Sequence, residues 1–364
     1  MMSEKIKCLF IHNAVPEYRI EFWKLLGKKV ELQLLITQKG LENEIYGLKK
    51  DSSGLRIDYW NNNWLSLVKK YDVVIVPPVE TLHDWEIAYK VANECKKRKI
   101  PCIYWNERWE WNKKEIPVKR KLSYFAHRIM IKFVCKNVNQ TIASGTKAKE
   151  YLEMLNCRRI SVAYDSSTSP RVEVQSDFSQ LYGIQKGEKI ILYLGRIIEQ
   201  KGLDILLRAY EELENKPWLL IVGEGEFEKQ CGQYVKYHNL NKVIFIGKVQ
   251  PNLRSEYYRQ AHVFVMPSVL RKGRNDAWGL TINEALEQGT PVIATDVCGG
   301  AYDLLSEDSG IMVRNGSVEE LYQALSYYLQ KEKPVKTCME CYSKYSVMNM
   351  CKSFYQAIEC CVYG

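Results

Sequence analysis

The sequence lacks a long hydrophobic run, and this absence excludes whole classes of protein. No window approaches the run of about 18 apolar residues that a membrane-spanning helix requires. The first residues, MMSEKIKCLFIHNAV, carry charges of both signs where a signal peptide would have a longer apolar stretch. We therefore expect a cytoplasmic chain without a membrane-spanning segment.

The sequence also lacks low-complexity tracts. Of its 364 residues, 46% are hydrophobic and 26% are charged, which is the composition of an ordinary globular protein and does not favour disorder. A single hydrophobic core stops growing at about 250–300 residues, so we expect two domains.

The cysteines lack the spacing of a zinc site. Zinc sites show two close pairs or histidine partners, whereas the carboxyl-terminal tail has one close pair, Cys338 and Cys341, and no histidine. Cys351, Cys360 and Cys361 lie further apart from this pair. Since no export signal precedes them, we expect all 12 cysteines to be reduced and to pack as small hydrophobes, with no metal.

Positive charge is concentrated in the first half of the chain. Residues 1–170 contain 30 Lys and Arg against 19 Asp and Glu, a net charge of +11, so the remainder carries −2 of the overall +9. Nucleic acid, an anionic membrane, an anionic substrate or simply a solvated lysine-rich face would each account for this asymmetry.

Short apolar runs alternate with helical patterns, which predicts an α/β fold with parallel sheets. In the first half we expect strands at 7–11, 30–36, 72–76, 102–105 and 140–143, and helices at 17–27, 82–97, 118–136 and 147–155. The segment DSSTSPRVEVQSDFSQ, residues 165–180, has neither periodicity, and we place the interdomain connection there. A second series follows, with the runs KIILYLG, WLLIVGEG, KVIFIG, AHVFVMPS and PVIATD.

The octamer GRIIEQKG, residues 195–202, follows an apolar run and opens a predicted helix. Arg196 and Lys201 would then stand beside backbone N–H groups at a helix N-terminus, which favours anions. A guanidinium and an ammonium together suit a diphosphate, whose charge rises as a bond to its oxygen breaks. The alternative is a strand-to-helix turn with exposed basic residues.

VGEGE, residues 222–226, is a second glycine-rich strand end, with Gly223 and Gly225. The third glycine of the dinucleotide fingerprint is absent because Glu-Phe-Glu follows Gly225. This disfavours a classical Rossmann dehydrogenase.

The segment DAWGLTINEALEQG, residues 276–289, has two carboxylates eight positions apart. If LTINEALEQG is a helix, Gly279 and Leu280 fall at its N-terminus, where their amides can face an anion. Glu284 would lie about one turn into the helix, placed to accept from two ribose hydroxyls, and Asp276 would point beyond the phosphates. The alternative is a capped helix with two structural acidic residues.

In this order and spacing, GRIIEQKG, VGEGE, FIGKV, FVMPS and DAWGLTINEALEQGTPVIATDVCGGAYDLL resemble the C-terminal domain of family 4 (group 1) retaining glycosyltransferases. That family has the α/β GT-B fold, two facing Rossmann-like βαβ domains with an interdomain cleft. The resemblance covers residues 188–330 and extends to AVPEYRIEFW, which is similar to members with a Pro-Tyr-Arg turn in place of a glycine-rich loop. The first acid of the family pattern is commonly Glu, so Asp276 shortens its reach by one methylene.

The resemblance implies an acceptor-binding domain at 1–168, onto which a helix at 346–364 packs back, and a nucleotide-sugar-binding domain at 169–345. Arg196 and Lys201 would hold the donor diphosphate, Glu284 its ribose and Asp276 its sugar. Other donor contacts would come from the backbone near Gly195, Gly223, Gly225, Val249, Gly279, Leu280 and Thr281.

The activity implied is transfer of a sugar, with retention, from a nucleotide diphosphate sugar to a glycan or lipid-linked oligosaccharide in cell-surface polysaccharide synthesis. The donor would be UDP- or GDP-linked, and no metal and no nucleic acid would take part. Two alternatives stay open: a GT-B sugar-nucleotide epimerase, and a noncatalytic basic protein that binds nucleic acid or membrane.

Two residues of the first half are candidates for the acceptor side. Glu107 follows the run CIYW, where similar enzymes place a polar residue toward the acceptor, and His12 ends the first strand. The alternatives are a solvated loop carboxylate for Glu107 and a histidine with a structural hydrogen bond for His12.

The segment KRKLSYFAHRIMIKFVCK, residues 119–136, has apolar residues at helical spacing and cations elsewhere. The apolar positions are Leu122, Phe125, Ile129 and Phe133. Such a helix can lie on an anionic bilayer, which would make the protein peripheral on the inner face of the plasma membrane. A stripe that faces the core, with a solvated basic back, is the alternative.

Overall fold

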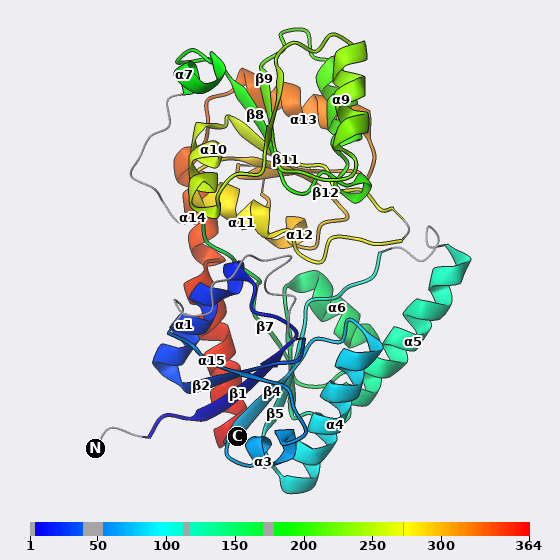
Figure 1. Ribbon diagram of the computed structural model, residues 1–364, viewed down its shortest axis with the longest axis vertical. Coiled ribbons are helices and arrows are strands. Elements are labelled where there is room, and N and C mark those ends of the chain that lie inside the picture. The colour runs from blue at the N-terminus through cyan, green and yellow to red at the C-terminus, as the bar shows by residue number, and fades with distance from the viewer. Residues whose placement is uncertain (1–3, 39–53, 112–116, 170–177, 272, 307) are drawn as a thin grey trace. The chain divides into compact units, whose positions relative to one another are not determined.

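The computed structural model describes residues 4–364 apart from 39–53, 112–116, 170–177, 272 and 307 (Figure 1). The chain divides into two compact units. The N-terminal unit comprises Met1–Glu110, Ile116–Ser167 and Val347–Gly364, and the C-terminal unit comprises Trp111–Glu115 and Thr168–Ser346.

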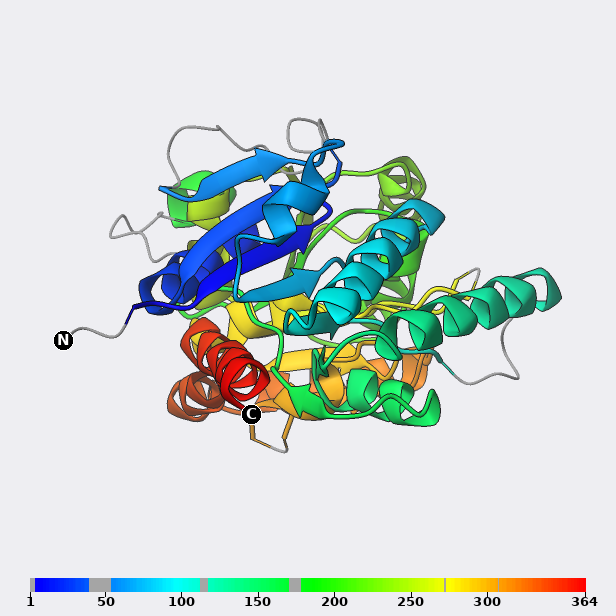
Figure 2. The ribbon, with the colours of Figure 1, turned by 90° about the horizontal axis from the view of Figure 1, so that it is seen from below.

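The N-terminal unit is built on a sheet whose described strands run in the order β3-β2-β1-β4-β5-β6-β7. Every neighbouring pair is parallel, and Figure 2 shows the blue and cyan strands side by side. Central strands such as Val-Val-Ile-Val of β4 are buried on both faces, as the continuous apolar runs predict. The strands are β1 (Lys7–His12), β2 (Glu31–Ile36), β3 (Arg56–Tyr59), β4 (Val73–Val76), β5 (Cys102–Asn106), β6 (Gln140–Ala143) and β7 (Ile160–Val162).

Helices cover this sheet in two packed pairs, α1 against α15 and α4 against α5. The helix α4 begins with a capping box in which Thr81 accepts from the amide of Asp84 and the Asp84 carboxylate accepts from that of Thr81. The helices of the unit are η1 (Glu17–Arg19), α1 (Ile20–Lys29), α3 (Trp64–Val68), α4 (Leu82–Arg98), α5 (Val118–Cys135), α6 (Thr146–Met154) and α15 (Val347–Tyr363).

The C-terminal unit has a second parallel sheet, in the order β10-β9-β8-β11-β12-β13. Its strands are β8 (Ile190–Leu194), β9 (Trp218–Val222), β10 (Val243–Gly247), β11 (Val263–Met266), β12 (Val292–Thr295) and β13 (Gly310–Val313). Its helices are α7 (Phe178–Tyr182), η3 (Glu199–Lys201), α8 (Leu203–Glu211), α9 (Glu228–Tyr237), η4 (Pro251–Leu253), α10 (Arg254–Gln260), α11 (Leu280–Glu287), α12 (Ala301–Leu304), α13 (Val318–Gln330) and α14 (Val335–Lys344).

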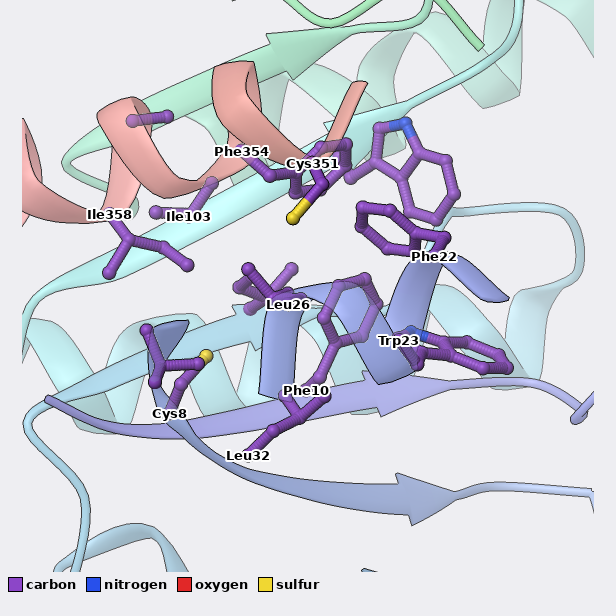
Figure 3. Packing of buried hydrophobic residues seen from close by; sticks show 14 of the residues in the cluster. Cys8, Phe10, Phe22, Trp23, Leu26, Leu32, Ile103, Cys351, Phe354 and Ile358 are labelled. Carbon is purple, nitrogen blue, oxygen red and sulfur yellow. The ribbon is translucent and has the colours of Figure 1, made fainter. Parts of the chain in front are cut away.

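The core of the N-terminal unit joins segments from both ends of the described chain. In Figure 3, Phe354 of α15 packs among Phe22 of α1 and Phe10 of β1. The ring centroids of Phe354 and Phe22 are 4.8 Å apart, and those of Phe354 and Trp105 are 5.2 Å apart, both in edge-to-face arrangements. This one face of the sheet therefore depends on residues more than 300 positions apart in the sequence.

Most predicted elements of the first half are present within one residue of their expected bounds. The helix expected at 17–27 begins instead as the 3-10 turn η1 after Pro16, and its α-helical part runs to Lys29. Strands β3 and β7 and helix α3 were missed, because they are short and β3 alternates exposed charges with half-buried residues at the sheet edge. The segment 165–180 was expected to contain no helix, yet α7 starts at Phe178.

Within the described ranges, none of the helices combines the length and the apolar composition needed to cross a bilayer.

The packing of α15 gives a first testable prediction. Phe354→Ala should lower the free energy of unfolding of the N-terminal unit by about 3–5 kcal/mol, because Phe354 is fully buried among aromatic rings and its removal leaves a cavity. Met348→Ala on the same helix is the matched control, since Met348 is 69% exposed, and it should change stability by less than about 0.5 kcal/mol. Denaturant unfolding followed by tryptophan fluorescence measures both. Equal effects of the two substitutions would contradict the packing of α15.

Candidate active site

The polar groups of the C-terminal unit gather where its sheet reverses. From β8 the strands are added outward through β9 to β10, and the chain then returns to place β11 on the other side of β8. Because all strands are parallel, the loops after β8 and β11 emerge together at the carboxyl edge of the sheet and diverge there. Ligands in open α/β sheets bind at this switch point.

The loops after β8 and β11 meet through an ion pair. The Nζ of Lys201 contacts the carboxylate of Asp276, and the same carboxylate oxygen accepts a hydrogen bond of 3.1 Å from Ser268 Oγ. The side chains of Lys201 and Asp276 are 23% and 21% exposed, so both can be reached by a ligand. The structure thus brings together two of the predicted site residues, 75 positions apart.

The backbone of Asp276 is fixed independently of its side chain. Its amide donates to the carbonyl of Val297 at 3.0 Å, and its carbonyl accepts from the amide of Gly299 at 3.1 Å. The loop that carries Asp276 is therefore anchored to the turn that follows β12. These two backbone hydrogen bonds hold the residue that carries the carboxylate in place.

Arg196 follows β8 directly, and its side chain is exposed. Its carbonyl accepts a 2.8 Å hydrogen bond from the hydroxyl of Tyr193, and the amide of Gly195 donates to the carbonyl of Val222 at 3.0 Å. The backbone at Arg196 is thus held while the guanidinium lies at the surface of the switch point.

Glu284 lies on α11, which begins at Leu280 after Gly279. Only 5% of Glu284 is exposed, and its Oε2 accepts a 3.0 Å hydrogen bond from the hydroxyl of Tyr258. Burial, together with the neighbouring carboxylate, raises the pKa of Tyr258 well above its usual value, so this hydroxyl stays a donor. No pattern in the sequence pointed to Tyr258 as the partner of Glu284.

The first turn of α11 needs a glycine before it. Gly279 has φ = 93°, and a Cβ there would lie 2.9 Å from the Sδ of Met266. Thr281, in the same turn, donates from its Oγ1 to that sulfur at 3.5 Å. The turn is thereby packed onto the end of β11, beside Asp276.

Gly223 and Gly225 have a packing role that the sequence pattern did not reveal. A Cβ on Gly223 would lie 1.9 Å from the carbonyl oxygen of Gly195, and one on Gly225 would lie 2.1 Å from that of Ile197. The amide of Ile197 also donates to the carbonyl of Glu224 at 2.9 Å. The loops after β8 and β9 therefore touch backbone to backbone. Val249, predicted to contact the base, lies two residues beyond β10 and is half-buried.

The N-terminal unit carries a buried charge cluster at the carboxyl edge of its own sheet. Arg19 is 1% exposed and pairs with two carboxylates: its Nη2 lies 2.7 Å from Asp165 Oδ2 and 2.8 Å from Glu107 Oε1. Its guanidinium also lies 4.8 Å from the ring centre of Trp105. The pattern Pro-Tyr-Arg was noted in the sequence, but Arg19 and Asp165 were not proposed as partners, because 146 residues separate them.

The cluster shifts the titration of its members. The pKa of Glu107 is raised to about 7, mainly by burial, which Arg19 opposes and the carboxylates of Asp165 and Glu80 reinforce. For Arg19, burial lowers the pKa, but the carboxylates of Asp165 and Glu107 outweigh it and the net pKa is raised. Glu107 is therefore a part-buried carboxyl that titrates near neutrality and not a solvated loop residue.

His12 is buried at the end of β1. Its Nδ1 lies 2.8 Å from the carbonyl oxygen of Ala14, and its ring packs 5.5 Å from that of Trp23. The pKa of His12 is lowered to about 4, mainly by burial and also by the charge of Arg19, against the opposing effect of the hydrogen bond with Ala14. The imidazole is neutral at pH 7 and makes the kind of structural hydrogen bond weighed for it from the sequence.

The tail cysteines pack singly. Cys338 is buried, and the thiol of Cys341 lies 3.1 Å from the carbonyl oxygen of Leu304. Among the residues that the structure describes, no three His, Cys, Asp or Glu side chains gather as a metal site would require.

Comparison with solved structures shows the class of fold. HepE of Anabaena, solved in complex with UDP, matches with a TM-score of 0.75 and 15% identity, over 98% of this chain and 100% of that one. The lipopolysaccharide outer core galactosyltransferase WaaB, in its apo form, matches with a TM-score of 0.72 and 16% identity, over 97% and 99%. At such identities the likeness shows the fold alone. The chain has the GT-B fold, and the predicted fold class is confirmed.

Comparison of sequences finds a family match over the C-terminal part of the chain. Residues 174–344 match the family described as "Glycosyl transferases group 1". The matched range contains the motifs from GRIIEQKG to DAWGL that carry the resemblance to group 1 glycosyltransferases.

The curated relatives align over part of their length. An uncharacterized glycosyltransferase of Methanocaldococcus jannaschii is 33% identical over 148 residues, which is 39% of this chain and 36% of that protein. The alpha-monoglucosyldiacylglycerol synthase of Streptococcus pneumoniae is 34% identical over 116 residues, 31% of this chain and 25% of that protein. The phosphatidyl-myo-inositol mannosyltransferase of Mycobacterium leprae is 30% identical over 168 residues, 44% and 42%. The chain thus aligns with 25% to 42% of the length of these relatives.

The charge cluster gives a second prediction. Arg19→Met should lower the free energy of unfolding by about 3–5 kcal/mol, because it leaves two buried carboxylates without their cation. The loss should be smaller at pH 5 than at pH 8, because low pH favours protonation of the unpaired carboxyl groups and so removes their buried charge. Denaturant unfolding at both pH values measures this. Asp165→Asn added to Arg19→Met should recover part of the loss. An Arg19→Met variant as stable as wild type at pH 8 would contradict the cluster.

Proposed function

We propose that the protein is a glycosyltransferase that moves a sugar from a nucleoside diphosphate sugar to a hydroxyl of a glycan or lipid-linked oligosaccharide, with retention of configuration. The observation that carries this proposal is the contact between Lys201 and Asp276 at the switch point, which joins the loop after β8 to the loop between β11 and α11. The match of residues 174–344 to the group 1 family supports it.

We propose a UDP- or GDP-linked donor. Two solved structures of Anabaena HepE contain UDP with glucose or UDP-glucose, and they match this chain with TM-scores of 0.72 and 0.71. These ligands were bound to that protein, and they make UDP-glucose the first donor to try on this one.

In the proposed arrangement each charged side chain binds a different part of the donor. Arg196 and Lys201 hold the diphosphate and stabilise the negative charge that grows on it as the glycosidic bond breaks. Glu284 accepts from the ribose hydroxyls, and Asp276 accepts from hydroxyls of the transferred sugar. Asp276 already accepts from Lys201 and Ser268, which suits a carboxylate that positions hydroxyls.

Retention follows if the acceptor hydroxyl approaches the face from which the diphosphate leaves. The sugar then passes through an oxocarbenium-like state, and the departing phosphate oxygen takes the proton of the acceptor hydroxyl. This route requires no enzymic base. The two cations and the N-terminus of α11 replace the charge that a metal ion would supply. We therefore expect the reaction to proceed in the presence of a metal chelator such as EDTA.

We place this reaction in cell-surface polysaccharide synthesis, at the inner face of the plasma membrane. The matched relatives include proteins named for glycolipid synthesis in Streptococcus pneumoniae and Mycobacterium leprae. The N-terminal unit would bind the acceptor, and the C-terminal unit the donor.

A donor panel tests the proposal. The purified chain is incubated in EDTA with UDP- and GDP-linked sugars and with short glycan acceptors, and products are followed by mass spectrometry. We expect one donor to release its nucleoside diphosphate together with a glycosylated acceptor, whose anomeric configuration is read by NMR. Release of a free epimer would instead identify an epimerase. If no product forms, no donor binds and the chain binds RNA, the proposal that the protein is an enzyme is contradicted.

Variants of the two cations test the site. Arg196→Ala and Lys201→Ala should each reduce turnover by about two to three orders of magnitude, because each removes a charge that stabilises the developing diphosphate. Lys236→Ala is the matched control, since Lys236 is exposed in the last turn of α9, at the end of that helix opposite the switch point, and it should keep wild-type turnover. Circular dichroism checks the fold of all three. Wild-type turnover in both test variants would contradict the proposal that Arg196 and Lys201 bind the donor diphosphate.

A further inference from the structure

Helix α5 is apolar on two opposite faces. One face is buried against the N-terminal unit and presents Tyr124, Met130, Ile131 and Val134. The opposite face presents Val118, Leu122, Phe125, Ile129 and Phe133, which are 76%, 75%, 62%, 38% and 47% exposed. We call these five residues the outer stripe. Because the helix already buries its other face, the alternative of a core-facing stripe is wrong for these residues.

The outer stripe is continuous along the helix. Its members are spaced by four and three residues, so that they line up within about a quarter of the helix circumference at about 100° per residue. Single exposed apolar residues are common on soluble proteins, but a continuous row of five large ones indicates an interaction surface. The ring of Phe133 contacts the ring of Tyr89 on α4, with the ring centroids 6.3 Å apart.

Cations accompany the outer stripe, and acids do not. Lys121 and Lys132 are exposed and flank it on one side, and exposed Lys136 continues its line just beyond the helix. No Asp or Glu occurs between Val118 and Cys135. Arg128, by contrast, is engaged by Glu110 through a 2.9 Å hydrogen bond from its Nε.

The charges decide which partner fits. A second copy of this chain, docked through the same face around a two-fold axis, would bring the lysines of one helix against those of the other. A bilayer with anionic headgroups accepts both features at once, because the outer stripe enters the acyl boundary while the lysines reach up to phosphates. Charge complementarity therefore favours a lipid surface over self-association.

We infer that α5 is the membrane-docking helix of this protein and lies in the plane of an anionic lipid surface with its outer stripe inserted. This inference rests on the peripheral location within the proposed function and names the surface and the lipid chemistry that achieve it. It places the basic N-terminal unit, which the acceptor is proposed to reach, on the bilayer.

Vesicle sedimentation tests the inference with the full chain. Vesicles of phosphatidylcholine containing about 30 mol% phosphatidylglycerol should bind the wild-type protein at least about tenfold better than pure phosphatidylcholine, and high salt should weaken the binding. Leu122→Ser with Phe125→Ser should reduce binding to the anionic vesicles by about tenfold or more, since it removes the inserted side chains. Lys121→Glu with Lys132→Glu should do the same by reversing the attraction.

Matched controls come from the C-terminal unit. Leu181→Ser with Tyr237→Ser removes two apolar residues that are 59% and 82% exposed, and it should leave vesicle binding unchanged. Lys229→Glu with Lys236→Glu reverses two exposed lysines on α9 and should also have little effect.

Three outcomes would overturn the inference: no binding of wild type to anionic vesicles, equal binding of the outer-stripe variant and wild type, or a concentration-dependent dimer in light scattering that Phe125→Ser abolishes. Release of the nucleoside diphosphate from the donor, measured with a soluble acceptor and without vesicles, should be equal in wild type and in the outer-stripe variant. Vesicle binding without nucleotide release from any donor would refute the proposed function and still support docking by α5.

Discussion

The parallel direction of every strand is the constraint on which both candidate sites depend. In a parallel sheet each strand must be followed by a crossover, so all carboxyl ends lie at one edge and all the loops that leave them emerge together. This geometry brings Lys201 to Asp276 in the C-terminal unit across 75 residues. It also brings Arg19 to Glu107 and Asp165 in the N-terminal unit across 88 and 146 residues. Both units thus bring charged side chains together at the carboxyl edge of a parallel sheet, but the two sets of side chains differ.

The chemistry of the two edges differs in solvent exposure. Lys201 and Asp276 are each exposed by about a fifth, so their ion pair can open to a ligand at modest cost. Arg19 is sealed among Trp105, Tyr18 and two carboxylates, where loss of any partner leaves an uncompensated charge. The first arrangement suits exchange of partners during a reaction cycle. The second suits a fixed scaffold from which the quarter-exposed Glu107 projects.

Local pattern predicted most of the strands and helices, because central strands of a parallel sheet are unbroken apolar runs. It missed β3, whose charged residues mark an edge strand, and it gave no helix to the segment that contains α7. The motifs located the loops of the C-terminal site, and Lys201 and Asp276 do meet there. Pattern could not show that Gly223 and Gly225 are required by contact between two loops, nor that Tyr258 holds Glu284, since both are facts of packing across the sheet. The same holds for the outward direction of Leu122 and Phe125, because periodicity defines a face without saying what it meets.

The packing of α15 in the N-terminal core limits the order in which the two units can fold during synthesis. Residues 168–346 are contiguous and can complete their own core as soon as they leave the ribosome. The sheet made earlier, from β1 to β7, must wait with Phe10, Phe22 and Trp105 uncovered until Phe354 and Ile358 emerge. Domain completion then runs opposite to the usual amino-to-carboxyl order. The nascent N-terminal unit therefore keeps these side chains uncovered for as long as the other unit takes to be translated.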